Sequence, residues 1–203
     1  AREYDLTVNT LLLGAWGLLL SRYSGQDDVI FGATRAARHT TLEGAQDMVG
    51  LFINTLPIRV RVQGQMSVES LLRELRTQWI TLRDYEHTPL GSIQKWSDVA
   101  PGQPLFESLV VFENHQLNST LRGQGGNWQK REFELLGTTN YPIVLSGELG
   151  EALALEISYN CARFEENSIS RMLGHLQNIL EGMAADPEKH VSDLPFLTDA
   201  ERH

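Results

Sequence analysis

The segment from Met48 to Val62 constrains the fold of this chain most, because it joins two hydrophobic patterns around one polar pair. From Ile58 to Val62, apolar and basic residues alternate, which is typical of a strand with one buried and one open face. Between Leu51 and Leu56 the run is almost continuously apolar and encloses Asn54-Thr55. A buried polar pair without hydrogen-bond partners would cost about 1–3 kcal/mol, so both side chains require partners.

Two interpretations of Asn54 and Thr55 are open at this level. In the first, Asn54 is a structural residue that hydrogen-bonds neighbouring backbone, as most buried polar side chains do. In the second, the pair faces a cavity where a reactive group is positioned. Gly50 agrees with both, because glycine permits a turn or the close approach of another backbone. Arg59, on the alternating part of the strand, is expected to form a structural ion pair.

The remaining hydrophobic periodicity predicts four helices. Thr7 is a good N-cap for a helix that runs to about Tyr23 and ends at Ser24-Gly25. This helix is apolar on nearly all sides, so we expect it to be buried on most of its surface. Amphipathic spacing predicts two further long helices and a short one that begins at a proline. Their ranges are 68–82, 169–183 and 89–96.

Strands are predicted between these helices, and the polar stretch 35–41 is predicted to be a loop. The run 109–112 is too continuously apolar for an edge strand and indicates a central one. The other predicted strands are 29–34, 133–136 and a hairpin of 141–146 with 152–159. Long helices alternating with strands predict an α/β protein, a two-layer sandwich in which a mixed sheet is covered by long helices.

Composition makes several classes of partner and location unfavourable for this chain. The 203 residues carry a formal net charge of −9 with a sequence pI near 5.1, which argues against nucleic acid and anionic membranes as partners. No apolar run reaches the roughly 18–20 residues of a membrane span. A lone cysteine, Cys161, excludes an intrachain disulfide and is consistent with a reducing cytoplasm, where we expect the protein. We expect Cys161 to be buried and inert.

No residue pattern in this chain predicts a catalytic proton-transfer group or a metal site. The six histidines are scattered, and there is no phosphate-binding glycine loop or nucleophile elbow. His87 follows Glu86, but adjacent residues on a helix face different ways, so we expect a structural or solvent-facing His87. In the predicted loop, Arg38 is either a solvated charge or a candidate contact for a carboxylate or a phosphate.

The stretch Gly50 to Arg59 resembles the Gly-x-Phe-x-Asn-Thr-Leu-x-x-Arg motif of nonribosomal peptide synthetase condensation domains. Further segments are similar to other blocks of that family, so the resemblance extends from Tyr4 to Glu201. These segments are 11–25, 28–32, 85–96, 105–114, 140–142 and 194–198. The family has two lobes, each similar to chloramphenicol acetyltransferase, and the resemblance implies such a lobe here.

The family also carries a His-His-x-x-x-Asp-Gly motif in its first lobe, and its second His is the proposed active-site residue. This chain has no adjacent histidines. It therefore looks like the second, C-terminal lobe over residues 1–193, inactive alone and without a catalytic residue. By the same resemblance, 114–132 is a candidate latch that crosses to the first lobe, and 194–203 is a linker toward a following domain.

In the family, an acceptor amine attacks a donor thioester in a tunnel between the lobes. Both substrates are attached as thioesters to 4′-phosphopantetheine arms of carrier proteins, so the resemblance implies that the lobe itself binds no cofactor or metal. The resemblance implies that Asn54 and Thr55 line this tunnel. It also implies the first lobe, the donor and acceptor carrier proteins and an adjacent adenylation domain as partners. Two alternatives are a non-catalytic lobe that docks such partners and the matching lobe of an epimerisation or cyclisation domain.

Overall fold

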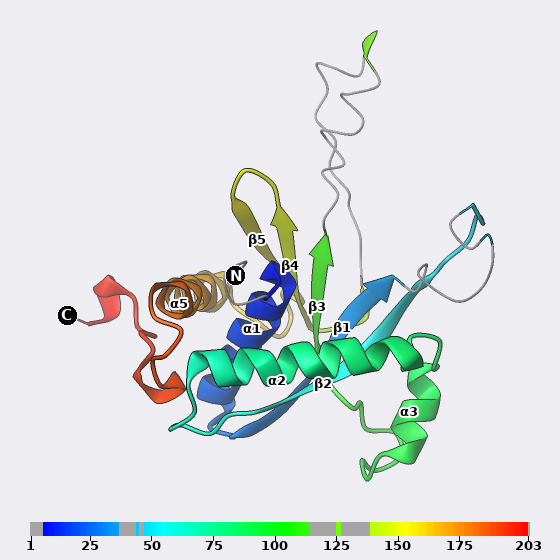
Figure 1. Cartoon of the computed structure of the whole chain (residues 1–203), viewed down its shortest axis with the longest axis horizontal. Coiled ribbons are helices and arrows are strands. Elements are labelled where there is room, and N and C mark those ends of the chain that lie inside the picture. The colour runs from blue at the N-terminus through cyan, green and yellow to red at the C-terminus, as the bar shows by residue number, and fades with distance from the viewer. Residues whose placement is uncertain (1–5, 37–43, 45–46, 114–124, 127–138, 203) are drawn as a thin grey trace.

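A five-stranded mixed sheet is the central element of the fold. The structure is a computed structural model and describes residues 6–36, 44, 47–113, 125–126 and 139–202. The strands are β1 (Asp28–Ala36), β2 (Ile53–Arg61), β3 (Ser108–Glu113), β4 (Ile143–Leu149) and β5 (Leu153–Tyr159). Their order is β2-β1-β3-β4-β5 (Figure 1). The inner pairs β1–β3 and β3–β4 are parallel, and the outer pairs are antiparallel. β3 is therefore central, as predicted.

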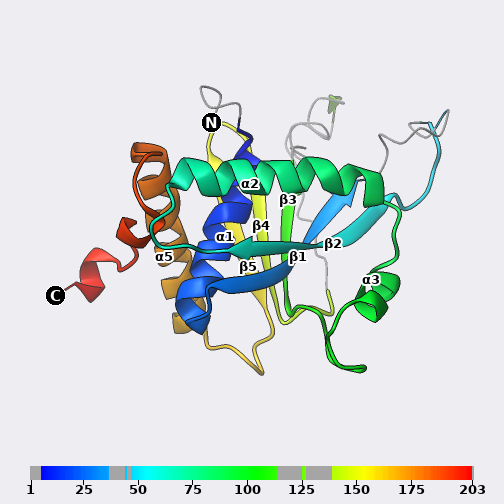
Figure 2. The same cartoon turned by 60° about the horizontal axis from the view of Figure 1, so that its bottom comes forward.

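Three long helices cover one face of this sheet, with α1 lying between α2 and α5 (Figures 1 and 2). The three long helices are α1 (Val8–Ser24), α2 (Val68–Thr81) and α5 (Glu166–Ala185), and the shorter helix α3 spans Leu90–Trp96. Short 3-10 turns are η2 (Leu82–Tyr85), η4 (Val191–Asp193) and η5 (Asp199–Glu201). None of the helices in the described part of the chain has the length and apolarity needed to cross a membrane.

The central helix α1 begins and ends where the sequence predicts. The Thr7 side chain accepts a hydrogen bond from the backbone N–H of Thr10, and Gly25 ends the helix in the left-handed conformation. Gly17 lets α1 approach the sheet closely, because a Cβ there would lie 2.7 Å from a side-chain atom of Val60 on β2. With helices on two sides and the sheet on a third, nearly every face of α1 is buried, as its composition predicts.

Alternate residues of the strands face the helices and form one continuous core. Phe31 on β1, Ile58 on β2 and Leu145 on β4 are all within this core and almost fully buried. The opposite face of the sheet has a smaller cover, in which the rings of Phe106 and Tyr141 stack with centroids 5.6 Å apart. The expected two-layer arrangement, a mixed sheet covered by long helices, is thus confirmed.

The prediction for Cys161 is wrong, because its side chain is exposed. Cys161 lies in the turn after β5, where Asn160 accepts backbone hydrogen bonds from Ala162, Arg163 and Phe164. This turn faces solvent, and its position outweighs the general preference of cysteine for burial. The candidate latch 114–132 (apart from Gly125 and Gly126), the predicted strand 133–136 and Arg38 lie outside the described residues.

The C-terminal segment after α5 packs back onto the helices. Leu194 is buried, and Arg22 of α1 donates hydrogen bonds to the carbonyl oxygens of Val191 and Leu194 at 2.9 and 3.1 Å. Asn178 of α5 donates to the carbonyl oxygens of Phe196 and Leu197. The predicted linker 194–203 therefore starts as a packed part of the fold, and its connection to a following domain stays a prediction.

Candidate functional site

The candidate pair Asn54 and Thr55 lies at the start of β2, directly opposite Arg35 and Thr34 of β1. Successive side chains of a strand point to opposite faces of the sheet. Asn54 and Arg35 consequently share the helix-covered face, whereas Thr55 and Thr34 share the other. The structure thus places the two candidate residues on different surfaces.

Both amide protons of Asn54 are used within the chain. Its Nδ2 donates to the carbonyl oxygens of Glu86 at 2.8 Å and Thr88 at 2.9 Å, and its Oδ1 accepts from the backbone N–H of Thr55. An Asn side chain has only two donor protons, so no donor is left for a ligand. These contacts correspond to the first interpretation, in which Asn54 bonds nearby backbone, here the connection between α2 and α3.

Arg35 reaches the same connection from the neighbouring strand. Its Nε hydrogen-bonds the Glu86 carboxylate, and its Nη1 donates to the carbonyl oxygen of Trp79 at 2.5 Å. The guanidinium also lies over the Trp79 ring, 4.5 Å from its centroid. The side chains of Arg35 and Glu86 are only 9% and 6% exposed, so this is a buried ion pair.

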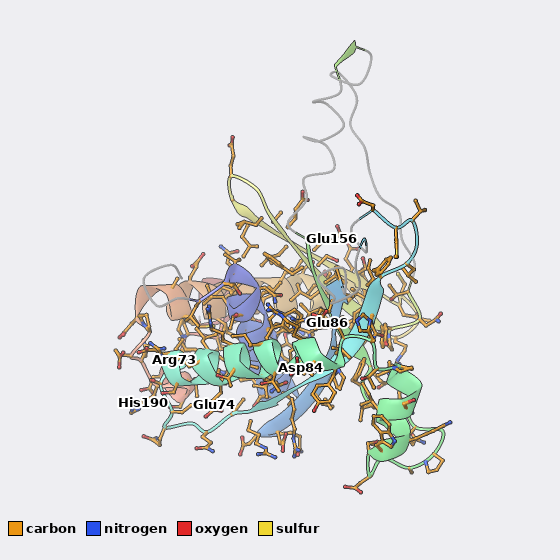
Figure 3. The ribbon with its side chains drawn as sticks, turned by 45° about the vertical axis from the view of Figure 1, so that its right-hand side comes forward. Arg73, Glu74, Asp84, Glu86, Glu156 and His190 are labelled. Atoms are coloured by element: carbon orange, nitrogen blue, oxygen red, sulfur yellow. The ribbon has the colours of Figure 1, made fainter. Side chains whose placement is uncertain are left out.

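Sequence reasoning missed this ion pair, because the polar composition of stretch 35–41 predicts a loop there. β1 in fact continues to Ala36, since its last residues pair with Ile53 and Asn54 of β2. Figure 3 shows Glu86 beyond the end of α2 and beside the strands, whereas Arg73 and Glu74 lie along α2 itself. The neighbouring His87 is exposed, which agrees with a solvent-facing role.

A cavity of about 540 Å³ lies where the carboxyl ends of β1, β3 and β4 meet the first turn of α1. Arg35, Glu86 and Trp79 form part of its wall, and Arg83 of η2 adds a second basic group. Parallel strands place their carboxyl ends at one sheet edge, which is a common position for binding sites in α/β folds. The mixture of charged and apolar lining suits a ligand with both polar and apolar parts.

Thr55 belongs to a separate cluster on the opposite face of the sheet. Its side chain hydrogen-bonds the hydroxyl of Tyr141, which stacks on Phe106. Burial raises the pKa of the Tyr141 hydroxyl, and the Thr55 hydrogen bond offsets part of this rise. The cluster packs tightly, because a Cβ at Gly32 would lie 2.9 Å from the Thr55 methyl group.

Other polar clusters among the described residues have structural partners. Arg59 forms the expected ion pair, with Nε and Nη2 at 2.8 and 2.7 Å from the two carboxylate oxygens of Asp28. His175 of α5 is buried between the hydroxyl of Tyr23 and the carboxylate of Glu201, a contact that sequence reasoning did not predict. Within the described ranges, His, Cys, Asp and Glu side chains form no group of three or more that could hold a metal ion.

Comparison with known proteins gives consistent matches over the whole chain. The family model described as the condensation domain matches residues 1–203. The chain is 41% identical to a linear gramicidin synthase protein of Brevibacillus parabrevis over 99% of its own length and 3% of that protein. It is 36% identical to the chondramide synthase of Chondromyces crocatus over 100% of its length and 5% of that protein. It thus spans only a small part of these relatives.

Solved structures share the fold at lower sequence identity. The chain superposes on the first condensation domain of the CDA synthetase with a TM-score of 0.74 and 14% identity, covering 98% of this chain and 44% of that one. A holo four-domain nonribosomal peptide synthetase bound to AMP and glycine gives a TM-score of 0.81 and 16% identity, covering 100% of this chain and 16% of that one. These likenesses show the acetyltransferase-like fold expected from the sequence.

Proposed function

This chain belongs to the condensation-domain family, and from that premise we propose that it is the second half of a peptide-bond-forming domain in nonribosomal peptide synthesis. The observation that carries the proposal is the match over residues 1–203, combined with coverage of 44% of a solved condensation domain. In this assignment residues 1–193 are the C-terminal lobe, 114–132 latch onto the first lobe, and 194–203 lead to a following domain.

In the proposed reaction, the amine of an acceptor aminoacyl thioester attacks the carbonyl carbon of a donor thioester. The new C–N amide bond forms, the C–S bond breaks, and the donor phosphopantetheine arm leaves as a thiol that takes up the proton lost by the amine. Both arms belong to carrier proteins, which are the proposed partners together with the first lobe and an adenylation domain in the cytoplasm. Proton transfer belongs to the first lobe, so this half is inactive alone.

We propose that Asn54 and Thr55 contribute to the substrate tunnel from different sides of β2. For Asn54, polarising the thioester carbonyl would require breaking its two hydrogen bonds to backbone carbonyls. Its contacts instead support an indirect role, in which it holds the backbone of Glu86 and Thr88 in the position that the tunnel wall requires. Arg38 is retained as a proposed contact for a carboxylate or for the phosphate of the pantetheine arm.

The test is amide formation between a donor-loaded and an acceptor-loaded carrier protein. We expect no product from this chain alone and product when the first lobe completes the domain. In the completed domain, Asn54→Ala is expected to lower the rate at least about tenfold, or about 1.4 kcal/mol of barrier, because precise positioning is lost.

Asn178→Ala is the matched control, since Asn178 also donates to two backbone carbonyls but on α5. Its rate should stay close to that of wild type. Product from the chain alone would show that a catalytic group lies in this half. A completed domain without activity would instead favour the non-catalytic docking lobe or the epimerisation or cyclisation lobe. If Asn54→Ala left the rate of amide formation unchanged, Asn54 would be only a structural hydrogen-bonding residue.

A further inference from the structure

We propose that the buried Arg35–Glu86 ion pair positions the connection between α2 and α3 for the condensation reaction, and that Arg35 is thereby a positioning residue. This inference rests on the proposed function. It concerns a pair that the family motif around Asn54 does not contain. Arg35 acts through Glu86 and Trp79, so its role is distinct from that of a catalytic residue.

Two side chains of the sheet, Arg35 and Asn54, together hold the connection between α2 and α3, and we call this pair of contacts the clamp. Arg35 and Asn54 are cross-strand partners on β1 and β2, and both side chains bind the same connection. Arg35 holds the Glu86 carboxylate and the carbonyl oxygen of Trp79, in the last turn of α2. Asn54 holds the carbonyl oxygens of Glu86 and Thr88, immediately before Pro89 and α3. Residues 79–88 are thus fixed to the sheet at Trp79, Glu86 and Thr88.

Stability alone is a weak reason for such a pair. Two charges lose their hydration on burial, so a buried ion pair is often no more stabilising than well-packed uncharged side chains of similar size. An Arg gives defined geometry instead, because its planar fork binds two partners at once and stacks on an aromatic ring. All three contacts are present at Arg35, which favours a positioning role over a purely energetic one.

Residues of the connection between α2 and α3 line a cavity, so their position affects its shape. Glu86, Trp79 and Arg35 form part of the wall of the 540 Å³ cavity at the carboxyl ends of β1, β3 and β4. On the same connection, Tyr85 is 55% exposed, a large side chain available to the rest of the domain. Small displacements of groups that orient a substrate can reduce rates by about two orders of magnitude. Loss of the clamp should therefore lower the rate of amide formation even in a variant that still folds.

The experiment uses the full-length synthetase with Arg35→Met, Glu86→Gln and the double variant Arg35→Met/Glu86→Gln. The single Arg35→Met leaves a buried unpaired carboxylate and is expected to lower the melting temperature, whereas the uncharged double variant should recover most of this loss. In the double variant we expect kcat for amide formation to fall at least about tenfold, with acceptor KM changed by less than about threefold.

The matched control is Arg163→Met/Glu107→Gln, which removes an exposed two-point ion pair between the turn after β5 and the segment before β3. Its kcat should stay within about twofold of wild type, because exposed pairs contribute little. Arg35→Lys is a second probe: it keeps the charge beside Glu86 but loses the planar fork and the stacking on Trp79, so it should fold and still show a reduced kcat.

The outcomes distinguish failure of the proposed condensation function from failure of the positioning role of Arg35. A wild-type synthetase that forms no amide would remove the proposed function itself. An active wild type with an equally active double variant would overturn the positioning role, whether or not the double variant is less stable. If the double variant fails to fold, Arg35→Lys decides: a wild-type kcat overturns the positioning role, and a lowered kcat in a folded protein supports it.

Discussion

Of the glycines on the described strands, Gly32 on β1 has the least room for an added Cβ. A Cβ there would overlap Cε2 of Phe106 and lie 2.8 Å from Cζ of the same ring, which is stacked on Tyr141. Gly32→Ala should therefore lower the free energy of unfolding by about 1–3 kcal/mol through overpacking. Urea denaturation of the chain measures this change.

Gly91 in α3 is the matched control, because a Cβ there meets no atom within 4 Å. Gly91→Ala should raise the free energy of unfolding by about 0.5–1 kcal/mol, since alanine loses less backbone entropy in a helix. Equal midpoints for wild type and Gly32→Ala would mean that Phe106 moves aside at little cost.

At the scale of elements, η5 is held to α5 through Glu201. Its carboxylate accepts hydrogen bonds from the hydroxyl and the backbone N–H of Thr198 and lies 2.6 Å from Nε2 of His175. The Thr198 hydrogen bonds, followed by that of His175, lower the pKa of Glu201 from 4.5 to about 2. Because the folded pKa is lowered, the stabilisation is complete above pH 4.5 and is lost as the pH falls toward about 2.

We therefore predict that Glu201→Gln destabilises the chain at neutral pH and that its difference from wild type shrinks below pH 4.5. Guanidinium unfolding of both proteins at a series of pH values measures the difference. Glu181→Gln, at an exposed position on the same α5, should follow wild type. A difference between Glu201→Gln and wild type that stays constant down to about pH 3 would contradict the link between this carboxylate and stability.

At the scale of the whole molecule, the segment that leads into the edge strand β2 exposes several apolar side chains. Val49, Leu51 and Ile53 expose 104%, 86% and 58% of their surface. β2 forms one edge of the sheet, and edges with exposed apolar residues pair readily with other chains. We expect the isolated chain to self-associate through this edge, because the proposed first lobe is absent.

Sedimentation velocity at increasing concentration tests this expectation. Leu51→Lys should shift the chain toward monomer, and Leu149→Lys, at an exposed position on β4, serves as the control. The chain carries a net charge of −9, so added salt should strengthen apolar association by screening repulsion within the Debye length of about 10 Å at 0.1 M. Association that weakens with salt would indicate ion pairing instead.

Signals within a few residues determined the elements of this protein. The Thr7 cap, the spacing of apolar residues in α2 and α5, and the apolar run of β3 all predict structure locally, because capping bonds and helical faces involve neighbours in sequence. The family motif likewise identified Asn54 as a candidate.

Only the tertiary structure decided what these residues contact. Arg35 and Glu86 are 51 positions apart, and Asn54 and Glu86 are 32 apart, so no local pattern predicts their contacts. The antiparallel pairing of β1 with β2 extended β1 to Ala36 and set Arg35 beside Asn54. The same pleat separated Asn54 from Thr55, because adjacent residues of a strand face opposite sides. Long-range pairing depends on how the whole core packs, and this packing decides which polar groups are buried together.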